Sequence, residues 1–260
     1  MKLEYYILLF FFMSMLGWLI EVAVKWIQYG RFINRGFLIG PYCPIYGVGA
    51  VLIVLLLSRF KADPFNVFAL AMLLCGTLEY ATSYTMEKLF HARWWDYSQK
   101  RFNLNGRVCA QTLIPFGLLG LALVYWLAPG LWSFFATWPP ILVDLTCFLL
   151  VGLLIADITV STSVLSRIRA AADYLEGDST EEITRKVRTI LSRQGVLHRR
   201  TLRAFPRARF TNERIRNQMK EKSSQLKQMA KEKEQLLRQE LEQLEERLRQ
   251  ERKARKDDET

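Results

Sequence analysis

Two carboxylates lie on one helical stripe inside an apolar stretch, and this pattern could do chemistry. Gly76, Glu79, Ser83 and Glu87 are spaced at i, i+3, i+7 and i+11, which places them on one face of a helix. A charged side chain in a bilayer costs roughly 3 kcal/mol even on lenient insertion scales, so this face should meet protein or a water-filled cavity. The plainer alternative is that Glu87 is interfacial and Glu79 hydrogen-bonds a neighbouring helix. Such acids could line a transport pathway or act as an acid–base pair.

A second polar stripe occurs in the first apolar run, from Tyr5 to Ile27. Ser14, Gly17, Glu21 and Lys25 repeat the same spacing. The run is long enough to cross roughly 30 Å of hydrocarbon, and we expect it to be retained as a spanning helix rather than cleaved as a signal peptide. An exposed i,i+4 pair between Glu21 and Lys25 remains the alternative interpretation.

Two loops carry the remaining polar candidates. The first, residues 31–50, is rich in glycine and proline yet too apolar for a solvated loop. We expect part of it to dip into the membrane, where irregular backbone must be buried in protein or line a wet cavity. The second, residues 91–109, contains Trp94, Trp95 and Tyr97, which are typical of a membrane interface. Across spans and loops, the candidates for a polar cavity or substrate pathway are Glu21, Asn34, Arg35, Glu79, Tyr80, Glu87, Asp96, Asn105 and Arg107.

We further expect Glu79 and Arg107 to share one polar cluster. Glu79 lies about two helical turns inside the expected membrane boundary, and the loop that carries Arg107 returns to the same face. If the two formed a buried ion pair, removing either partner would cost roughly 3 to 5 kcal/mol, because the other charge would be stranded.

The whole sequence predicts an all-α, polytopic membrane protein with a charged, helical tail. Half of the 260 residues are hydrophobic, yet the formal charge is +11. The long apolar runs lie in the first 165 residues, whereas the remaining residues are rich in Arg and Lys. We expect about five transmembrane helices, with a charge-free turn from Ala128 to Pro140 between the last two. Lys and Arg follow the first, third and fifth spans, so the positive-inside rule puts the N-terminus outside and the C-terminus in the cytosol. The middle-to-cytosolic parts of the spans then hold Glu21, Glu79, Glu87 and Asp157.

The predicted domains are a transmembrane domain (1–165), a basic juxtamembrane amphipathic segment (166–210) and a long charged helix (211–260). In the middle segment, Ser179 and Glu182 form a capping box, and Ile183 and Val187 begin an apolar stripe. Its basic residues could bind anionic lipid, or the helix could dock on its own protein. The candidate lipid contacts are Arg185, Lys186, Arg188, Arg199 and Arg200.

The last segment has no persistent heptad register, so a weak coiled-coil homodimer and a lone solvated helix both remain open. Nucleic acid is not favoured as a partner, since no binding module accompanies the charge.

Cysteine and histidine give no sign of a metal site. Cys43, Cys75, Cys109 and Cys147 are far apart, and the histidines are His91 and His198. No zinc spacing occurs, and we expect neither a metal, a cofactor nor a disulfide.

Several separated motifs together resemble one family. In order they are Glu21, NRGFLIGPYCPIYG (34–47), GTLEY (76–80), RWWDYS (93–98) and NLNGRVC (103–109). This combination resembles the ABC-transporter type IV family of CmpB-like bacterial permeases over roughly residues 5–150. The resemblance implies a multi-span bacterial inner-membrane protein, with residues 165–260 outside the shared pattern. No GxxxxGK[ST] loop occurs in the sequence, so an ATPase would be a separate chain.

The leading hypothesis from the sequence is a permease-like transport component of the bacterial cytoplasmic membrane, with a cytosol-facing polar cavity and a lipid bilayer around it. One alternative is a membrane enzyme or lipid-handling protein that uses the same carboxylates, although no nucleophile motif names a reaction. The other is a scaffold that acts through its cytosolic tail.

Overall fold

The computed structural model is built almost entirely of helices. It describes residues 3–34, 36–175, 179–192, 196–204 and 208–211, and short pieces between 215 and 238. The chain divides into two units, Met1–Asn212 and Glu213–Thr260. In the second unit the described pieces are helical, and residues 239–260 of the predicted long helix lie outside the described residues. All elements discussed below belong to the first unit.

In the part of the chain that the structure describes, four helical stretches are long and apolar enough to span a membrane. They are α1 (Leu3–Tyr29), α3 (Pro64–Phe90), the continuous stretch Ala110–Ala136 and α6 (Pro140–Tyr174). The helix α2 (Pro44–Leu57), extended by the short turn η1 (Ser58–Phe60), is apolar but shorter. At 1.5 Å per residue its 14 residues cover about 21 Å, less than a bilayer core. The all-α membrane-protein class is therefore confirmed; within the described residues, four helical stretches are long enough to span a membrane and one apolar helix is shorter.

The stretch Ala110–Ala136 differs from the sequence prediction. It comprises α4 (Ala110–Ala122), the π-helical segment η2 (Leu123–Leu127) and α5 (Ala128–Ala136). The turn predicted from Ala128 to Pro140 is therefore wrong over most of its length, because the helix continues to Ala136. Pro129 begins a new helical segment after a π turn, a position where its missing N–H is tolerated.

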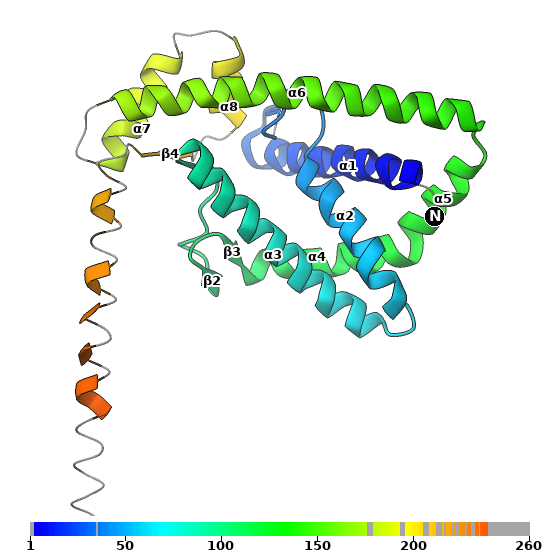
Figure 1. Ribbon diagram of the computed structural model, residues 1–260, viewed down its shortest axis with the longest axis horizontal. Coiled ribbons are helices and arrows are strands. Elements are labelled where there is room, and N and C mark those ends of the chain that lie inside the picture. Colours follow the sequence, from blue (N-terminus) through cyan, green and yellow to red (C-terminus); the bar gives the residue numbers. More distant parts are fainter. Residues whose placement is uncertain are drawn as a thin grey trace, which may run out of the picture. The chain divides into compact units, whose positions relative to one another are not determined.

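Small residues bring the helices close together. In Figure 1, α2 crosses α1, α3 and α4 run side by side, and α6 runs along α1. A Cβ on Gly47 of α2 would collide with the Phe10 carbonyl and the Ser14 hydroxyl of α1. A Cβ on Gly120 would collide with Ala71 of α3. Close helix contact through glycine is a common way to pack helices in lipid.

The chain after α6 folds back onto the loop that follows α3. There α7 (Thr180–Ser192) and α8 (Val196–Ala204) precede β4 (Arg209–Phe210), which pairs antiparallel with β1 (Ala92–Arg93). Nearby, β2 (Asn103–Leu104) pairs with β3 (Val108–Cys109). The His91 ring lies 3.1 Å from the Asp173 carboxylate of α6, and the His91 carbonyl accepts a hydrogen bond from Thr211 N–H at 3.1 Å.

The helix α7 docks on its own protein. The Ser179 hydroxyl accepts a hydrogen bond from Glu182 N–H at 3.2 Å, as expected for the predicted cap. Ile183 and Val187 are fully buried, and α7 packs against α6, α8 and β4. The start of the apolar stripe therefore contacts protein rather than lipid, as the alternative interpretation of this helix predicts.

Candidate binding cavity

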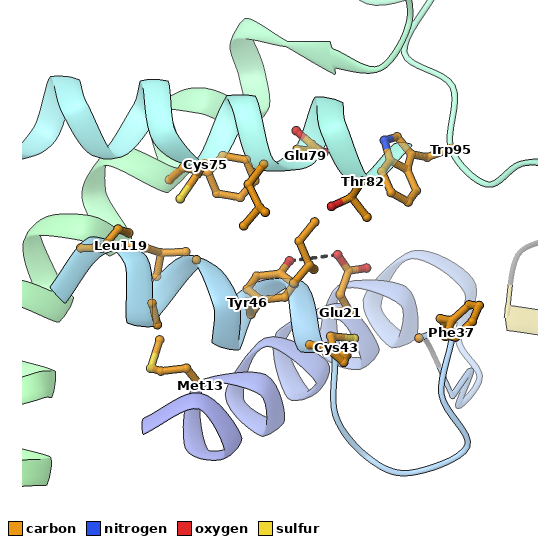
Figure 2. Close-up of a pocket in the computed structure, with 18 of the residues that line it drawn as sticks. Met13, Glu21, Phe37, Cys43, Tyr46, Cys75, Glu79, Thr82, Trp95 and Leu119 are labelled. Carbon is orange, nitrogen blue, oxygen red and sulfur yellow. Dashed lines mark hydrogen bonds between the residues drawn. The ribbon is translucent and has the colours of Figure 1, made fainter. Parts of the chain in front are cut away.

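A cavity of about 330 Å³ opens between α1, α2, α3 and α4 and the two loops described below. Most of its lining is apolar. The side chains that Figure 2 labels include Met13, Phe37, Cys43, Cys75, Trp95 and Leu119, together with two carboxylates, Glu21 and Glu79. The volume lies at the lower end of the range of small-molecule pockets.

Glu79 is the buried acid of this cavity, with 7% of its surface exposed. The Tyr97 hydroxyl donates to Glu79 Oε1 at 3.2 Å, and the Thr112 hydroxyl donates to Oε2 at 3.2 Å. Burial raises the pKa of Tyr97, and the charge of Glu79 raises it further. The phenol thus stays protonated and keeps its role as donor. Both partners of this carboxylate are neutral hydroxyls.

The stripe on α3 faces the protein, as its sequence pattern predicted. Gly76, Glu79 and Ser83 are all buried, and Leu113 of α4 lies against Gly76. Small and polar residues on this face let α4 pack closely while the acid stays away from lipid.

Glu21 is the second acid of the cavity and extends from α1. It is half-buried, and Tyr46 of α2 donates a hydrogen bond to its Oε1 at 3.1 Å, drawn as a dashed line in Figure 2. Ser14 and Gly17, earlier on the same stripe, are buried against α2. The first polar stripe therefore also faces protein.

Asp157 of α6 holds the first loop in place. Its carboxylate accepts hydrogen bonds from Ile39 N–H at 2.8 Å, Gly40 N–H at 2.7 Å and the Tyr42 hydroxyl at 2.8 Å. Ser161, one turn along α6, adds a fourth hydrogen bond at 2.9 Å. Irregular backbone in this loop is thus satisfied by protein, as expected for non-helical chain at membrane depth.

The sequence predicts Asp157 on the same side of the membrane as Glu21, Glu79 and Glu87, but Asp157 is not among the candidate residues. The signal that could have found it is an acid in an apolar run, one turn before Ser161 and opposite a loop rich in glycine and proline. Because the loop supplies Gly36, Phe37 and Cys43 to the cavity, Asp157 positions part of the cavity wall.

Arg107 pairs with Glu87 rather than with Glu79. Its Nη2 lies 2.9 Å from Glu87 Oε2, and its Nη1 donates to the Ser83 hydroxyl at 3.2 Å. The guanidinium is buried and lies near the rings of Tyr80 and Tyr84. Polar side chains therefore do cluster on this face of α3, but the guanidinium of Arg107 lies at Glu87 instead of Glu79.

Other predicted residues stabilise the loops. Asp96 lies 3.8 Å from Arg93 Nη1 and 3.5 Å from Arg209 Nη1. Burial alone would raise the Asp96 pKa, but hydrogen bonds from Ser98 and the two guanidinium charges bring it below its usual value. Asn105 Nδ2 donates to the Tyr80 hydroxyl at 2.9 Å.

From the middle of α1, Trp18 Nε1 donates to Asn34 Oδ1 at 2.7 Å. Arg35 lies outside the described residues. Among the predicted pathway residues that the structure describes, those that line the cavity are Glu21 and Glu79.

The predicted lipid contacts divide into two groups. Arg188 donates to the Ala208 carbonyl at 3.2 Å, and Arg200 donates to the Leu38 and Ile39 carbonyls. Burial lowers the pKa of both guanidinium groups. Lys186 pairs with Glu182 at 2.7 Å. The exposed members of the predicted set are Arg185 and Arg199.

Two tryptophans of the second loop pack inside the protein, whereas Phe102 of the same loop is exposed. Trp94 is buried and lies edge-on to Phe210, and Trp95 Nε1 donates to the Arg107 carbonyl at 3.1 Å. Both rings line the cavity. Within the described residues there is no group of three or more His, Cys, Asp or Glu side chains that could hold a metal ion, and all four cysteines are free thiols.

The fold is that of an α-helical membrane protein with a polar-edged internal cavity. A family model described as Putative ABC-transporter type IV matches residues 8–162, more than half of the chain, and the chain belongs to this family. The resemblance seen in the sequence motifs is thereby confirmed. No curated protein and no solved structure matches the chain.

Proposed function

We propose that this chain is a permease-like component of a bacterial transporter and that the cavity between α1, α2, α3 and α4 is part of its substrate pathway. The observation that carries this function is a small-molecule-sized cavity that contains the buried carboxylate of Glu79. A buried acid within a membrane span is costly, and such residues usually serve a substrate or ion pathway. Family membership supports a role in transport.

The charge pattern supports a cytosol-facing orientation of the cavity. Gly36 and Phe37 from one loop and Trp95 and Tyr97 from the other line the cavity. Lys and Arg are abundant around both loops, and cytosolic loops carry an excess of these residues. The positive-inside rule therefore favours a cytoplasmic-membrane protein with its C-terminus in the cytosol and its cavity near the inner face.

Filling the cavity tests this function. A Cβ on Gly49 would contact Leu78 at 3.5 Å and Cys75 at 3.8 Å, both of them lining residues, without a clash. Gly49→Leu should therefore occupy cavity volume while α2 remains helical. Gly152→Leu on α6 is the matched control, since a Cβ there meets nothing within 4 Å.

The readout is the metabolite profile of cells that lack the gene and carry one of these variants at equal membrane abundance. Gly49→Leu should give the profile of the deletion, and Gly152→Leu that of the wild type. A normal profile with folded Gly49→Leu would exclude the cavity as the pathway. An ATP-driven mechanism further requires a separate ATPase subunit, recognisable by its GxxxxGK[ST] motif in gently solubilised complexes.

The apolar lining also favours a second candidate, a lipid-handling protein. In that case the deletion and Gly49→Leu should alter membrane lipid composition and leave soluble metabolites unchanged. A scaffold, whether monomeric or paired through its C-terminal helix, would instead need residues 211–260 and tolerate Gly49→Leu. The exposed Arg185 and Arg199 would in each case be available to anionic lipid headgroups.

A further inference from the structure

We propose that the cavity binds an organic cation with an apolar body, such as an amphiphilic amine. This inference rests on the proposed function, because it names the substrate class of the same cavity. It combines three properties of the cavity: its charge, its apolar volume and its aromatic faces.

The charge of the cavity favours a cation. Its described lining includes the carboxylates of Glu21 and Glu79 and no Lys, Arg or His side chain. Arg107 of the neighbouring loop is occupied by Glu87 and Ser83. Glu79 is held by the Tyr97 and Thr112 hydroxyls, which orient the carboxylate and bring no positive charge to it. In a site shielded from water, such a carboxylate attracts an ammonium group strongly and repels an anion.

The apolar lining favours a ligand with a hydrocarbon body. The apolar side chains of the remaining wall include Met13, Ile53, Leu78, Phe116, Leu119 and Leu123. A simple inorganic cation would leave this surface in contact with water, whereas a hydrocarbon chain or ring would bury it. A volume of about 330 Å³ also exceeds the need of a bare metal ion, and the described residues contain no metal-ligand cluster.

The third property is the set of rings around the acids. Tyr46 and Tyr97 each hydrogen-bond one of the two carboxylates, and the Trp95 ring lies at the same end of the cavity in Figure 2. The face of an aromatic ring attracts a cation within about 6 Å, and desolvation strengthens this attraction. An ammonium group near the acids would therefore have both carboxylates and ring faces as partners.

Three ligands that share a six-carbon chain but differ in charge distinguish the effect of charge on binding from that of the hydrocarbon chain. Hexylammonium, hexan-1-ol and hexanoate carry charges of about +1, 0 and −1 at neutral pH. Their binding is measured by equilibrium dialysis against the full-length protein in phosphatidylcholine nanodiscs, with empty nanodiscs as the blank. We expect hexylammonium to bind at least tenfold more tightly than hexan-1-ol, and hexanoate to bind most weakly.

Variants then locate the interaction. Glu79→Gln should weaken hexylammonium binding at least tenfold and leave hexan-1-ol binding nearly unchanged. Asp144→Asn is the matched control, because Asp144 is an exposed acid of α6 outside the cavity, and it should bind hexylammonium as the wild type does. Equal binding of the three ligands by the wild type, no binding of hexylammonium, or full binding by Glu79→Gln would each overturn the assignment. The ligand series on the wild type needs no variant to fold.

The failure of this inference is distinguishable from failure of the proposed function. If Gly49→Leu reproduces the deletion phenotype but the three ligands bind equally, the cavity is the pathway and the substrate is not a cation. If hexylammonium binds selectively while Gly49→Leu cells show a normal metabolite profile, the cavity is a cation site without a transport role.

Discussion

Two regions on one face of α3 use their acids in opposite ways. In the cavity, the partners of the Glu79 carboxylate among the described residues are the hydroxyls of Tyr97 and Thr112. Two helical turns later, Glu87 is held by guanidinium groups, from Arg107 at 2.9 Å and Arg93 at 3.1 Å. We call this second region the ion-paired edge; it consists of Glu87, Arg93, Asp96, Arg107 and Arg209. The comparison teaches that a repeated sequence spacing does not imply a repeated function.

The turn before Arg107 decides which acid receives the cation. Asn105 and Gly106 both have left-handed backbone, with φ of 54° and 67°, and they reverse the chain sharply. The Gly106 carbonyl accepts from Tyr97 N–H at 2.7 Å. A Cβ on Gly106 would lie 2.7 Å from Asp96 Oδ1, so only glycine fits. This loop directs Arg107 toward Glu87 and the Tyr97 hydroxyl toward Glu79.

The largest expected effect comes from removing the central cation of the ion-paired edge. Arg107→Gln would leave Glu87 with Arg93 as its remaining guanidinium partner and would remove the donor to Ser83. Breaking a buried pair costs roughly 3 to 5 kcal/mol, but Glu87 is 36% exposed and keeps Arg93, so we expect a loss of about 2 kcal/mol. Thermal unfolding in detergent measures it.

Arg101→Gln is the matched control for this change, because Arg101 lies on the same loop and is exposed. It should unfold at the temperature of the wild type. Equal losses of stability for the two variants would show that Arg107 contributes no more than a solvated charge. The ion-paired edge and the cavity would then no longer differ in how their charges stabilise the fold.

A double-mutant cycle tests the pairing itself. Arg107→Gln combined with Glu87→Gln should be less damaging than the sum of the single changes, with a coupling of about 1 kcal/mol, because the two side chains are in contact. Arg107→Gln combined with Glu79→Gln should be additive within roughly 0.5 kcal/mol, since no contact joins them. Unfolding temperatures of the singles and doubles decide this, and a larger coupling to Glu79 would restore the pair expected from sequence.

A smaller, pH-dependent effect is expected at Asp96. Its pKa is lowered in the folded protein, so its contribution to stability is present above the unfolded pKa, near 4, and is lost as the pH falls through the folded value. Asp96→Asn should therefore destabilise by up to about 1 kcal/mol at pH 6, and the difference from wild type should shrink toward pH 3. A difference that stays constant with pH would mean that the carboxylate charge is not involved.

The sequence predicted the helices and the direction of both polar stripes well, because hydrophobic periodicity and the cost of charge in lipid depend on local spacing alone. Glu79 and Ser83 are buried on the predicted face, and Ile183 and Val187 form the predicted stripe of α7. The helix Ala128–Ala136 was missed because Pro129 and Gly130 resemble a turn in sequence. A preceding π segment lets the helix continue there.

The pairing of side chains could not be predicted from the sequence to the same degree. Whether Arg107 meets Glu79 or Glu87 depends on the φ angles of Asn105 and Gly106, and neither spacing nor composition specifies these. Contacts between distant segments are still harder to foresee, as with Asp157 and the Ile39 amide, 118 residues apart. Local patterns therefore located the acids, but the tertiary fold decides which acid remains available to a ligand.

The smallest expected change in stability is that of Glu79→Gln. It gives the most direct comparison between the acid of the cavity, Glu79, and the acid of the ion-paired edge, Glu87. The Gln carbonyl can still accept from the Tyr97 hydroxyl. The Gln amide can donate to the Thr112 oxygen, because the single Thr112 hydroxyl hydrogen can be given to the Cys109 carbonyl, 2.8 Å away. Replacing one satisfied polar group by another should change the free energy of unfolding by less than about 0.5 kcal/mol. Tyr97→Phe, which removes a donor instead of a charge, should cost more, about 1 kcal/mol. Thermal unfolding of both variants, beside Arg107→Gln, gives the order. If Glu79→Gln were as damaging as Arg107→Gln, the charge of Glu79 would stabilise the fold as Glu87 does, and the cavity would have no acid reserved for a ligand.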